Sequence, residues 1–324
     1  MLNNETMAPG AASSNRPYFL LLAPMLGITD VTFRNVFAKH FSGVDLSYAP
    51  FIKVNQNLDF KKSKMAELSP SLNRHLEVIP QIMCNDVAPF LHVSSILADL
   101  GYSQVNLNLG CPSPTSSGRG LGCGLMPDLE RVDRLLDGVF EGSPLKISIK
   151  TRLGLNSSED ISSLIPIFNR YPLDHVVIHP RTGKQGYSGE VDLEGFKKAS
   201  QQLKTVVCYS GDIKTFQDFQ SLRLKIPQVS HFLIGRGALR NPNVFTSIQS
   251  SSEVPLSTKD FSSFILELAD QYLEKDLSLK DVLIRAKTIC YYFASSHAFS
   301  PKQIKAIRKS RSMLEVAQSL AADL

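Results

Sequence analysis

Residues 205–212, TVVCYSGD, and residues 231–237, HFLIGRG, share one pattern, a short apolar run that ends in a polar turn with glycine. This pattern is typical of a buried strand that passes into a helix. Six earlier runs have helix-length stretches behind them: Phe19–Ala23, Val44–Tyr48, Val78–Met83, Gln104–Leu107, Leu145–Lys150 and His175–His179. Eight such units in about 240 residues predict an α/β fold, a (β/α)8 TIM barrel. A doubly wound sheet is the alternative, but it would place a glycine-rich turn after the first strand, where this chain has Ala-Pro-Met-Leu-Gly.

The chain after the barrel changes character. Residues 255–257 form a Pro-Leu-Ser linker, and no strand pattern follows it. Helical patterns cover Asp260–Lys275, Leu279–Ser296 and Pro301–Ala322. We therefore predict a catalytic barrel over residues 18–254 and a small C-terminal all-helical domain over residues 255–324. Residues 1–17 are polar, lack the features of a secretory signal, and are predicted to be a disordered leader.

Composition excludes several classes of protein. Of the 324 residues, 43% are hydrophobic and 20% are charged, which indicates a globular chain with a sizeable core. The longest apolar stretch, Phe19–Ile28, is too short to span a bilayer, so we expect no membrane association. The five cysteines are odd in number and lack C-x-x-C spacing, which argues against disulfides and metal sites and favours the cytoplasm.

Positive charge is concentrated near the C-terminus. The formal net charge is only +5, yet the segment from Val282 to Leu314 contains no acidic residue. Its seven basic residues are Arg285, Lys287, Lys302, Lys305, Arg308, Lys309 and Arg311. A basic segment on a nearly neutral body predicts a polyanionic partner.

Chemically useful residues stand where the predicted strands end. A TIM barrel builds its active site at the C-terminal ends of its strands, so these residues are expected to meet at one rim. They are Pro24, Met25, Gln81, Asn108, Cys111, Lys150, Arg152, His179, Arg181, Ser210, Gly211, Asp212, Gly235 and Arg236. This convergence predicts an active site.

The ends of the last two strands resemble phosphate-binding turns. Gly211 follows the seventh predicted strand, and Gly235 with Arg236 follows the eighth, where phosphate sites recur in this fold. Tight turns alone would explain either loop, but the two together favour a phosphorylated cofactor. Lys150 suits the negative charge of a reduced flavin, and an internal ion pair with Asp212 is the simpler alternative.

One cysteine differs from the others by position. Cys111 lies on a Gly-Cys-Pro turn at the predicted catalytic rim. Buried cysteines are ordinarily inert packing residues, which is our expectation for Cys84, Cys123, Cys208 and Cys290.

These residues lie in stretches that resemble the tRNA-dihydrouridine synthase family. The stretches are LAPMLGITD (22–30), NLNLGCPSP (106–114), KTRLG (150–154), HPRTGKQGY (179–187), SGDI (210–213) and IGRGAL (234–239). They follow the family order, and together they are far more specific than any one alone. Three positions depart from the family: Ser210 stands where Asn is common, Cys123 replaces Gly or Ala, and Pro50 takes a place where Glu is frequent.

The resemblance implies an FMN enzyme that reduces the C5–C6 bond of uridine in tRNA with NADPH as reductant. It implies that Cys111 is the acid that protonates C5. The residues implied to bind the cofactor are Pro24, Met25, Gln81, Lys150, His179, Ser210, Gly211, Asp212, Gly235 and Arg236. Those implied to bind the substrate are Asn108, Arg181, Tyr187, Arg285, Lys287, Lys305, Arg308, Lys309 and Arg311. The tail looks most like the branch that acts at tRNA position 16, and a monomer is expected.

Two other functions remain open from the sequence. A flavin barrel could act on a small pyrimidine such as dihydroorotate, since the ring chemistry is similar. A barrel that only binds RNA is the third reading, although it would not need Lys150, His179 and Cys111 on one rim. The basic helical tail favours the RNA-modifying enzyme, because a small substrate does not require it.

Overall fold

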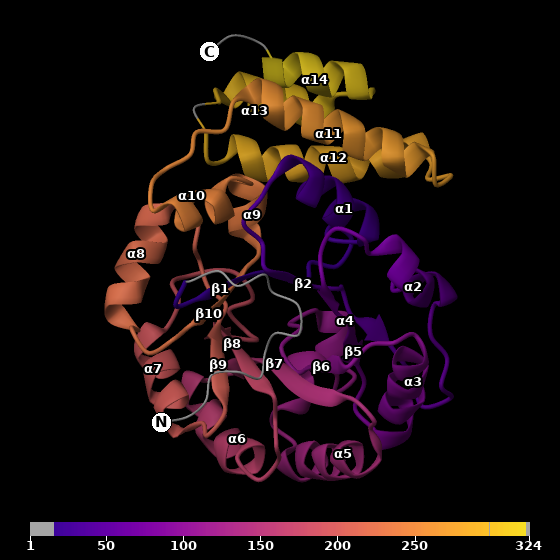
Figure 1. Cartoon of the computed structure of the whole chain (residues 1–324), viewed down its shortest axis with the longest axis vertical. Helices are drawn as coiled ribbons and strands as arrows, with labels where there is room; N and C mark the ends of the chain where they lie inside the picture. Colours follow the sequence, from indigo (N-terminus) through magenta and orange to yellow (C-terminus); the bar gives the residue numbers. More distant parts are fainter. Residues whose placement is uncertain (1–15, 298, 322–324) are drawn as a thin grey trace.

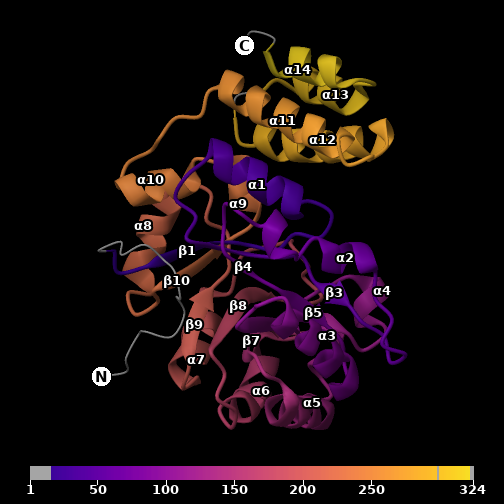
Figure 2. The same cartoon turned by 45° about the vertical axis from the view of Figure 1, so that its right-hand side comes forward.

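The computed structural model describes residues 16–297 and 299–321. Figures 1 and 2 show a barrel of strands surrounded by helices, with a group of four helices at one end of the molecule. The strands are β1 (Phe19–Leu22), β2 (Leu46–Tyr48), β3 (Ile52–Lys53), β4 (Val78–Ile79), β5 (Gln81–Met83), β6 (Gln104–Asn108), β7 (Lys146–Gly154), β8 (His175–Thr182), β9 (Val206–Tyr209) and β10 (His231–Ile234). The surrounding helices are α1 (Val31–His40), α2 (Lys62–Ala66), α3 (Val87–Asp99), α4 (Pro114–Ser117), α5 (Leu129–Gly142), α6 (Ile161–Phe168), α7 (Leu193–Gln202), α8 (Phe216–Lys225), α9 (Arg236–Arg240) and α10 (Val244–Ser250).

The sheet closes on itself as a (β/α)8 barrel. Every strand pair is parallel, and the first strand, β1, pairs with the last, β10. The third predicted strand is divided into β4 and β5 by Pro80, which has no N–H to donate to the ladder. The second predicted strand, Val44–Tyr48, corresponds to β2 and is followed by a further short strand, β3. β2 pairs with β4, and β3 pairs with β5. The predicted fold class is therefore confirmed, with two strands interrupted.

Strands β7 and β8 run further than the sequence pattern indicated. The predicted ends were Lys150 and His179, whereas the strands continue to Gly154 and Thr182. Arg152 and Arg181 therefore lie within strands. Both side chains are buried, so their positions are fixed by the barrel wall.

Four helices follow the barrel. They are α11 (Thr258–Leu273), α12 (Leu279–Ala294), α13 (Pro301–Lys309) and α14 (Met313–Ala321). The helical pattern over residues 301–322 is divided into α13 and α14, because the chain leaves the helical conformation at Ser310, where ψ is 139°. No helix of the described residues is both long and apolar enough to cross a bilayer.

The four helices pack against the first helix of the barrel. The ring of Phe264 on α11 lies 5.8, 6.2 and 5.2 Å from the rings of Phe33, Phe37 and Phe41, measured between centroids. Asp30, the N-cap of α1, also accepts a hydrogen bond from Tyr272 and pairs with Arg285 at 2.8 Å. The tail is thus held by an aromatic cluster and a charged one.

The predicted leader extended two residues too far. Arg16 pairs with Asp45 at 2.7 Å and therefore belongs to the folded part of the chain. The rest of that prediction, residues 1–15, lies outside the described residues.

Candidate active site

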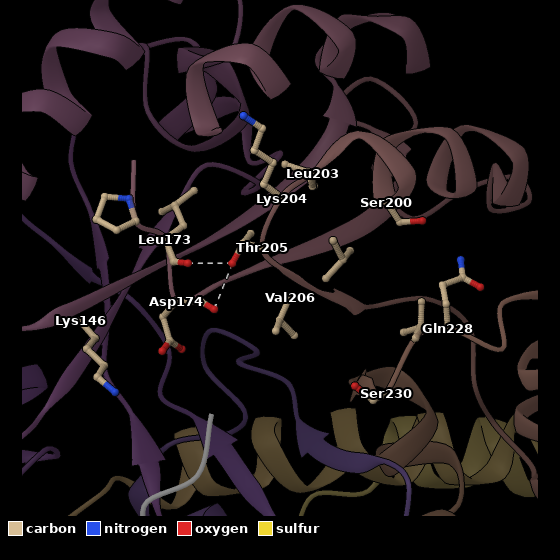
Figure 3. A pocket seen from close by; sticks show the side chains of 13 residues that line it. Lys146, Leu173, Asp174, Ser200, Leu203, Lys204, Thr205, Val206, Gln228 and Ser230 are labelled. Carbon is tan, nitrogen blue, oxygen red and sulfur yellow. Dashed lines mark hydrogen bonds between the residues drawn. The ribbon is translucent and has the colours of Figure 1, made fainter. Parts of the chain in front are cut away.

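The residues predicted at the strand ends line a single cavity of about 800 Å³ at the C-terminal end of the barrel. Its walls include Pro24, Met25, Gln81, Asn108, Cys111, Lys150, His179, Arg181, Tyr187, Ser210, Gly211, Asp212, Gly235 and Arg236. A second cavity of about 560 Å³ lies at the other ends of the strands, with Lys146, Asp174 and Ser230 around it (Figure 3). None of the predicted site residues lines that second cavity. The site is therefore at the end of the barrel where this fold carries its chemistry.

The backbone of Cys111 is held from two sides. The side-chain oxygen of Asn108 accepts hydrogen bonds from the N–H groups of Gly110 (3.1 Å) and Cys111 (2.9 Å). On the other side, Cys123 N–H donates to the Cys111 carbonyl at 3.1 Å. Gly122, with φ +56°, lies against Cys111: a Cβ on Gly122 would be only 2.8 Å from the Cβ of Cys111. These contacts fix a half-buried thiol at the cavity wall.

The other four cysteines are buried, as a packing role requires. Burial raises the pKa of Cys84 to about 12 and that of Cys123 above its usual value. Cys111 is the most exposed of the five and lines the cavity. These positions agree with the different expectation for Cys111, whose catalytic role stays a prediction.

Lys150 does not pair with Asp212, so the simpler explanation of this lysine is wrong. Its ammonium has no hydrogen bond or ion pair with any residue that the structure describes. Burial, together with the charge of Arg152, lowers the pKa of Lys150 to about 8. A lysine placed this way at a cavity wall is stabilised by an incoming anion.

Asp212 instead joins two arginines. It accepts hydrogen bonds from Arg181 at 2.5 Å and from Arg236 at 2.7 Å. Burial alone would raise the pKa of Asp212, but the hydrogen bonds and charges of the two arginines outweigh it and hold the pKa below its usual value. The carboxylate is therefore ionised, and it orients both guanidinium groups along one wall.

His179 is neutral in this setting. Burial and the charges of Lys150, Arg152 and Arg181 lower its pKa well below the usual value. Its Nδ1 faces the carbonyl of Ser210, which can only accept, so Nδ1 carries the proton. The lone pair then lies on Nε2, which is 3.3 Å from the guanidinium of Arg181.

Arg152 stands with Lys150 at a predicted strand end, but the sequence indicated no role for it. It donates from Nε to the carbonyl of Gly110 at 2.8 Å, and from one terminal nitrogen to the carbonyls of Thr182 (3.0 Å) and Gly186 (2.7 Å). It therefore joins the loop that carries Cys111 to the loop after β8. Its spacing, two residues after Lys150 on the same strand, was a usable signal.

Tyr187 lies between two guanidinium groups. The central carbons of Arg152 and Arg236 are 5.2 and 4.9 Å from the centroid of its ring. Arg236 also donates to the Tyr187 carbonyl at 3.2 Å. Tyr187 is 58% exposed and lines the cavity, so these contacts hold a residue that stays largely accessible.

Internal packing explains part of the glycine pattern in the two predicted phosphate turns. A Cβ on Gly211 would lie 2.1 Å from the Tyr209 hydroxyl, and one on Gly237 would lie 1.8 Å from the Ile213 carbonyl. Tight turns therefore account for these two glycines. Among the cations that line the cavity at these turns are Arg236, which also pairs with Asp212, and Lys214 and Arg240.

The cavity has further walls that no local motif predicted. They come from Phe51 after β2, and from Lys214, Arg240 and Tyr292. Pro50 and Lys184, which lie in stretches quoted from the sequence, line it as well. Tyr292 belongs to α12, so a residue of the helical tail reaches the cavity. Only the packing of the tail on the barrel brings Tyr292 there, so no local pattern indicates it.

The predicted tail cations do not line the cavity, and two of them have internal partners. Arg285 donates to the Gly27 carbonyl and pairs with Asp30, so its contacts are those of a structural tie to the barrel. Lys287 donates to the Arg308 carbonyl at 3.1 Å. The remaining four, Lys305, Arg308, Lys309 and Arg311, are exposed.

Comparison with known proteins places this site in a family. A sequence model of the family described as "Dihydrouridine synthase (Dus)" matches residues 21–321. A "Probable tRNA-dihydrouridine synthase" of Helicobacter pylori is 30% identical over 79% of this chain and 77% of the relative. A "tRNA-dihydrouridine(16) synthase" of Escherichia coli (strain K12) is 30% identical over 69% of this chain and 73% of the relative.

Solved structures show the same fold at low identity. A morphinone reductase in complex with tetrahydroNAD has a TM-score of 0.52 at 9% identity, with 72% of this chain and 87% of that chain covered. A variant of NCR from Zymomonas mobilis has a TM-score of 0.50 at 10% identity, with 74% and 88% covered. These two support the barrel, and the sequence match over most of its length shows that the chain belongs to the dihydrouridine synthase family.

Proposed function

We propose that this protein reduces the C5–C6 double bond of a uridine in tRNA to dihydrouridine, with bound FMN that is reduced by NADPH. The observation that carries the proposal is the single cavity in which Cys111, Lys150, His179 and Arg181 meet. The family membership points to the same reaction. Following the relatives named for position 16, we propose the uridine at that position as the target.

The cavity has the size and the donors that FMN requires. Its volume, about 800 Å³, is within the range of cofactor sites. The ammonium of Lys150 lacks a partner among the described residues, and a flavin ring would supply negative charge to it. Arg236 would bind the phosphate, with the turns at Ser210, Gly211 and Gly235 around it, and Pro24, Met25, Gln81 and His179 would complete the cofactor site.

We assign the proton-transfer step to Cys111. FMN, when bound and reduced, supplies the hydride that C6 receives. Negative charge then builds at C5, which takes the proton from Cys111 Sγ as the new C–H bond forms. The thiol becomes a thiolate and regains its proton from solvent. The backbone contacts of Cys111 keep its side chain at the wall while this happens.

Neighbouring residues would hold the uracil ring. The amide of Asn108 has a second N–H for a ring oxygen, and the accessible side chain of Tyr187 offers a stacking surface. Arg181, whose N–H groups already donate to Gly189, His179 and Asp212, would contribute its positive charge at the same wall. The target base must leave its stack in the RNA to enter the barrel, as it does in other base-modifying enzymes. His179, which is neutral, adds no charge here, and its Nε2 faces the guanidinium of Arg181.

The tail would hold the tRNA. Lys305, Arg308, Lys309 and Arg311 are exposed, and Tyr292 connects the same group of helices to the cavity. We therefore propose that residues 255–324 form the tRNA-binding part and residues 18–254 the FMN-binding part. We further propose a monomer that acts in the cytoplasm, where its five free thiols would stay reduced.

The test separates an RNA substrate from a small one. The holoenzyme is reduced by NADPH without oxygen and mixed with tRNA that lacks dihydrouridine, or with free uridine or orotate. Only the tRNA should reoxidise the flavin quickly, and dihydrouridine should appear at position 16 when the gene is restored to cells that lack it. Equal reoxidation by a free pyrimidine would contradict the tRNA assignment.

A further inference from the structure

A row of buried side chains connects three neighbouring strands directly below the Cys111 loop. Asn108 Nδ2 donates to Gln81 Oε1 at 2.8 Å, and Gln81 Nε2 donates to Asn106 Oδ1 at 2.7 Å. Asn106 Nδ2 then donates to Ser148 Oγ at 2.8 Å. In the strand register Gln81 lies opposite Asn106, and Asn106 lies opposite Ser148, so β5, β6 and β7 present the row on one face.

The direction of every hydrogen bond in this row is determined by the backbone of Gly110 and Cys111. Backbone N–H groups can only donate, so the Asn108 atom that faces them must be its oxygen. Its nitrogen must then face Gln81, whose oxygen accepts and whose nitrogen faces Asn106 in the same sense. Ser148 is the last member of the row on these three strands: its hydroxyl accepts from Asn106, and it also contacts the Val105 carbonyl at 3.4 Å and the side chain of Tyr48.

The members of the row differ in their access to the cavity. Gln81 and Asn108 line it, whereas Asn106 and Ser148 do not. Asn106 and Ser148 are 0% and 1% exposed, so no water can replace a lost partner there without rearrangement. Their hydrogen bonds keep the amides of Gln81 and Asn108 from rotating.

We propose that Asn106 and Ser148 are positioning residues for Cys111. They lock the amide of Asn108, which in turn holds the backbone N–H groups of Gly110 and Cys111. In the locked orientation, the amides of Gln81 and Asn108 each donate one N–H within the row, and the second N–H of each can donate to a ligand. The proposal rests on the proposed function only in that it makes Cys111 the proton donor.

The chain offers a matched pair of variants. Ser148→Ala removes the acceptor at the end of the row. Ser47→Ala is the control, because Ser47 is also a buried serine on a barrel strand and donates to a backbone carbonyl, that of Glu77, but lies outside the row. Asn106→Ser interrupts the row at its centre and should behave like Ser148→Ala.

The first measurement is the rate at which iodoacetamide alkylates Cys111 in the FMN-loaded protein, followed by mass spectrometry of the Cys111 peptide. We expect Ser148→Ala to react about fivefold faster than wild type, the factor that corresponds to one net hydrogen bond lost from the support of the loop. Ser47→Ala should react at the wild-type rate. Equal alkylation rates in Ser148→Ala, Asn106→Ser and Ser47→Ala would overturn the proposal.

The second measurement splits the reaction into halves. Reduction by NADPH should be unchanged in Ser148→Ala, while reoxidation by tRNA should slow about tenfold, because small displacements of a reacting group cost rate steeply. Loss of both halves together would indicate a general structural defect and would refute a positioning role. If wild-type protein failed to react with tRNA, the proposed function would fail, and the alkylation rates would still decide the positioning role.

Discussion

Replacement of Cys111 by alanine gives the sharpest test of the mechanism. Cys111→Ala should retain FMN and should still be reduced by NADPH, but it should transfer hydride to tRNA far more slowly. A positioned general acid contributes about 10²–10⁴ to a rate, which is about 3–5 kcal/mol of barrier. The prediction applies to the half-reaction with tRNA alone, because only that step moves a proton to C5.

The structure indicates that the substitution disturbs little else. The contacts that hold position 111 are made by backbone atoms, namely its N–H to Asn108 and its carbonyl to Cys123. Alanine keeps both. The thiol is half-buried, so we expect a loss in the free energy of unfolding of about 1 kcal/mol or less, small beside the kinetic effect.

The assay is single-turnover reoxidation of the NADPH-reduced enzyme by tRNA lacking dihydrouridine, without oxygen. Cys123→Ala is the control, since Cys123 is a buried cysteine in the 3-10 helix Gly122–Leu125 that follows α4, and its thiol packs against Gly183. We expect Cys123→Ala to be less stable than wild type by about 1–2 kcal/mol yet nearly as fast. If tRNA reoxidised the reduced Cys111→Ala variant at the wild-type rate, this thiol would have no part in the mechanism.

Three further predictions concern the cofactor and the tRNA. Arg236→Glu should lose FMN on gel filtration, seen as loss of the flavin band at about 450 nm, because it places an anion beside the phosphate; full retention would contradict this site. Burial lowers the pKa of Lys150 to about 8, so the free protein loses this charge as pH rises through that value, and FMN affinity in a titration should weaken there. Lys150→Met should flatten that profile, and an unchanged profile would refute the assignment. Each lysine removed from the set Lys302, Lys305 and Lys309 should lower the log–log salt slope of tRNA binding by about one, and an unchanged slope in the triple variant would exclude α13 as the docking surface.

The barrel was predictable because its signals are local. Each strand is a short apolar run, and Lys150, His179 and Arg236 stand at or just beyond a run's end. Since parallel strands end at one rim, residues far apart in sequence could be placed together before any contact was known. Pro80 inside the run Val78–Met83 was also a local signal of an interrupted strand, because proline cannot donate to a ladder.

Partners across the fold were not predictable in this way. Asp212 pairs with two arginines and not with Lys150. Which of these cations it binds depends on side-chain positions within about 3 Å, and the order of the strands does not determine those positions. Arg285 was counted with the tRNA-binding cations, yet it pairs with Asp30, more than 250 residues earlier in the chain. Charge pattern shows where cations are, and only the packing shows which are already neutralised.

The contact between α1 and α11 has a consequence for how the chain is made. Phe33, Phe37 and Phe41 leave the ribosome long before their partner Phe264, and β1 likewise precedes its neighbour β10. At ordinary rates of translation this interval is on the order of ten seconds or more. Throughout it, the nascent chain carries an uncovered aromatic face and an unpaired strand edge. Exposed apolar surfaces and unpaired strand edges promote aggregation, so we expect the partly made chain to be at its most aggregation-prone until its last helices emerge.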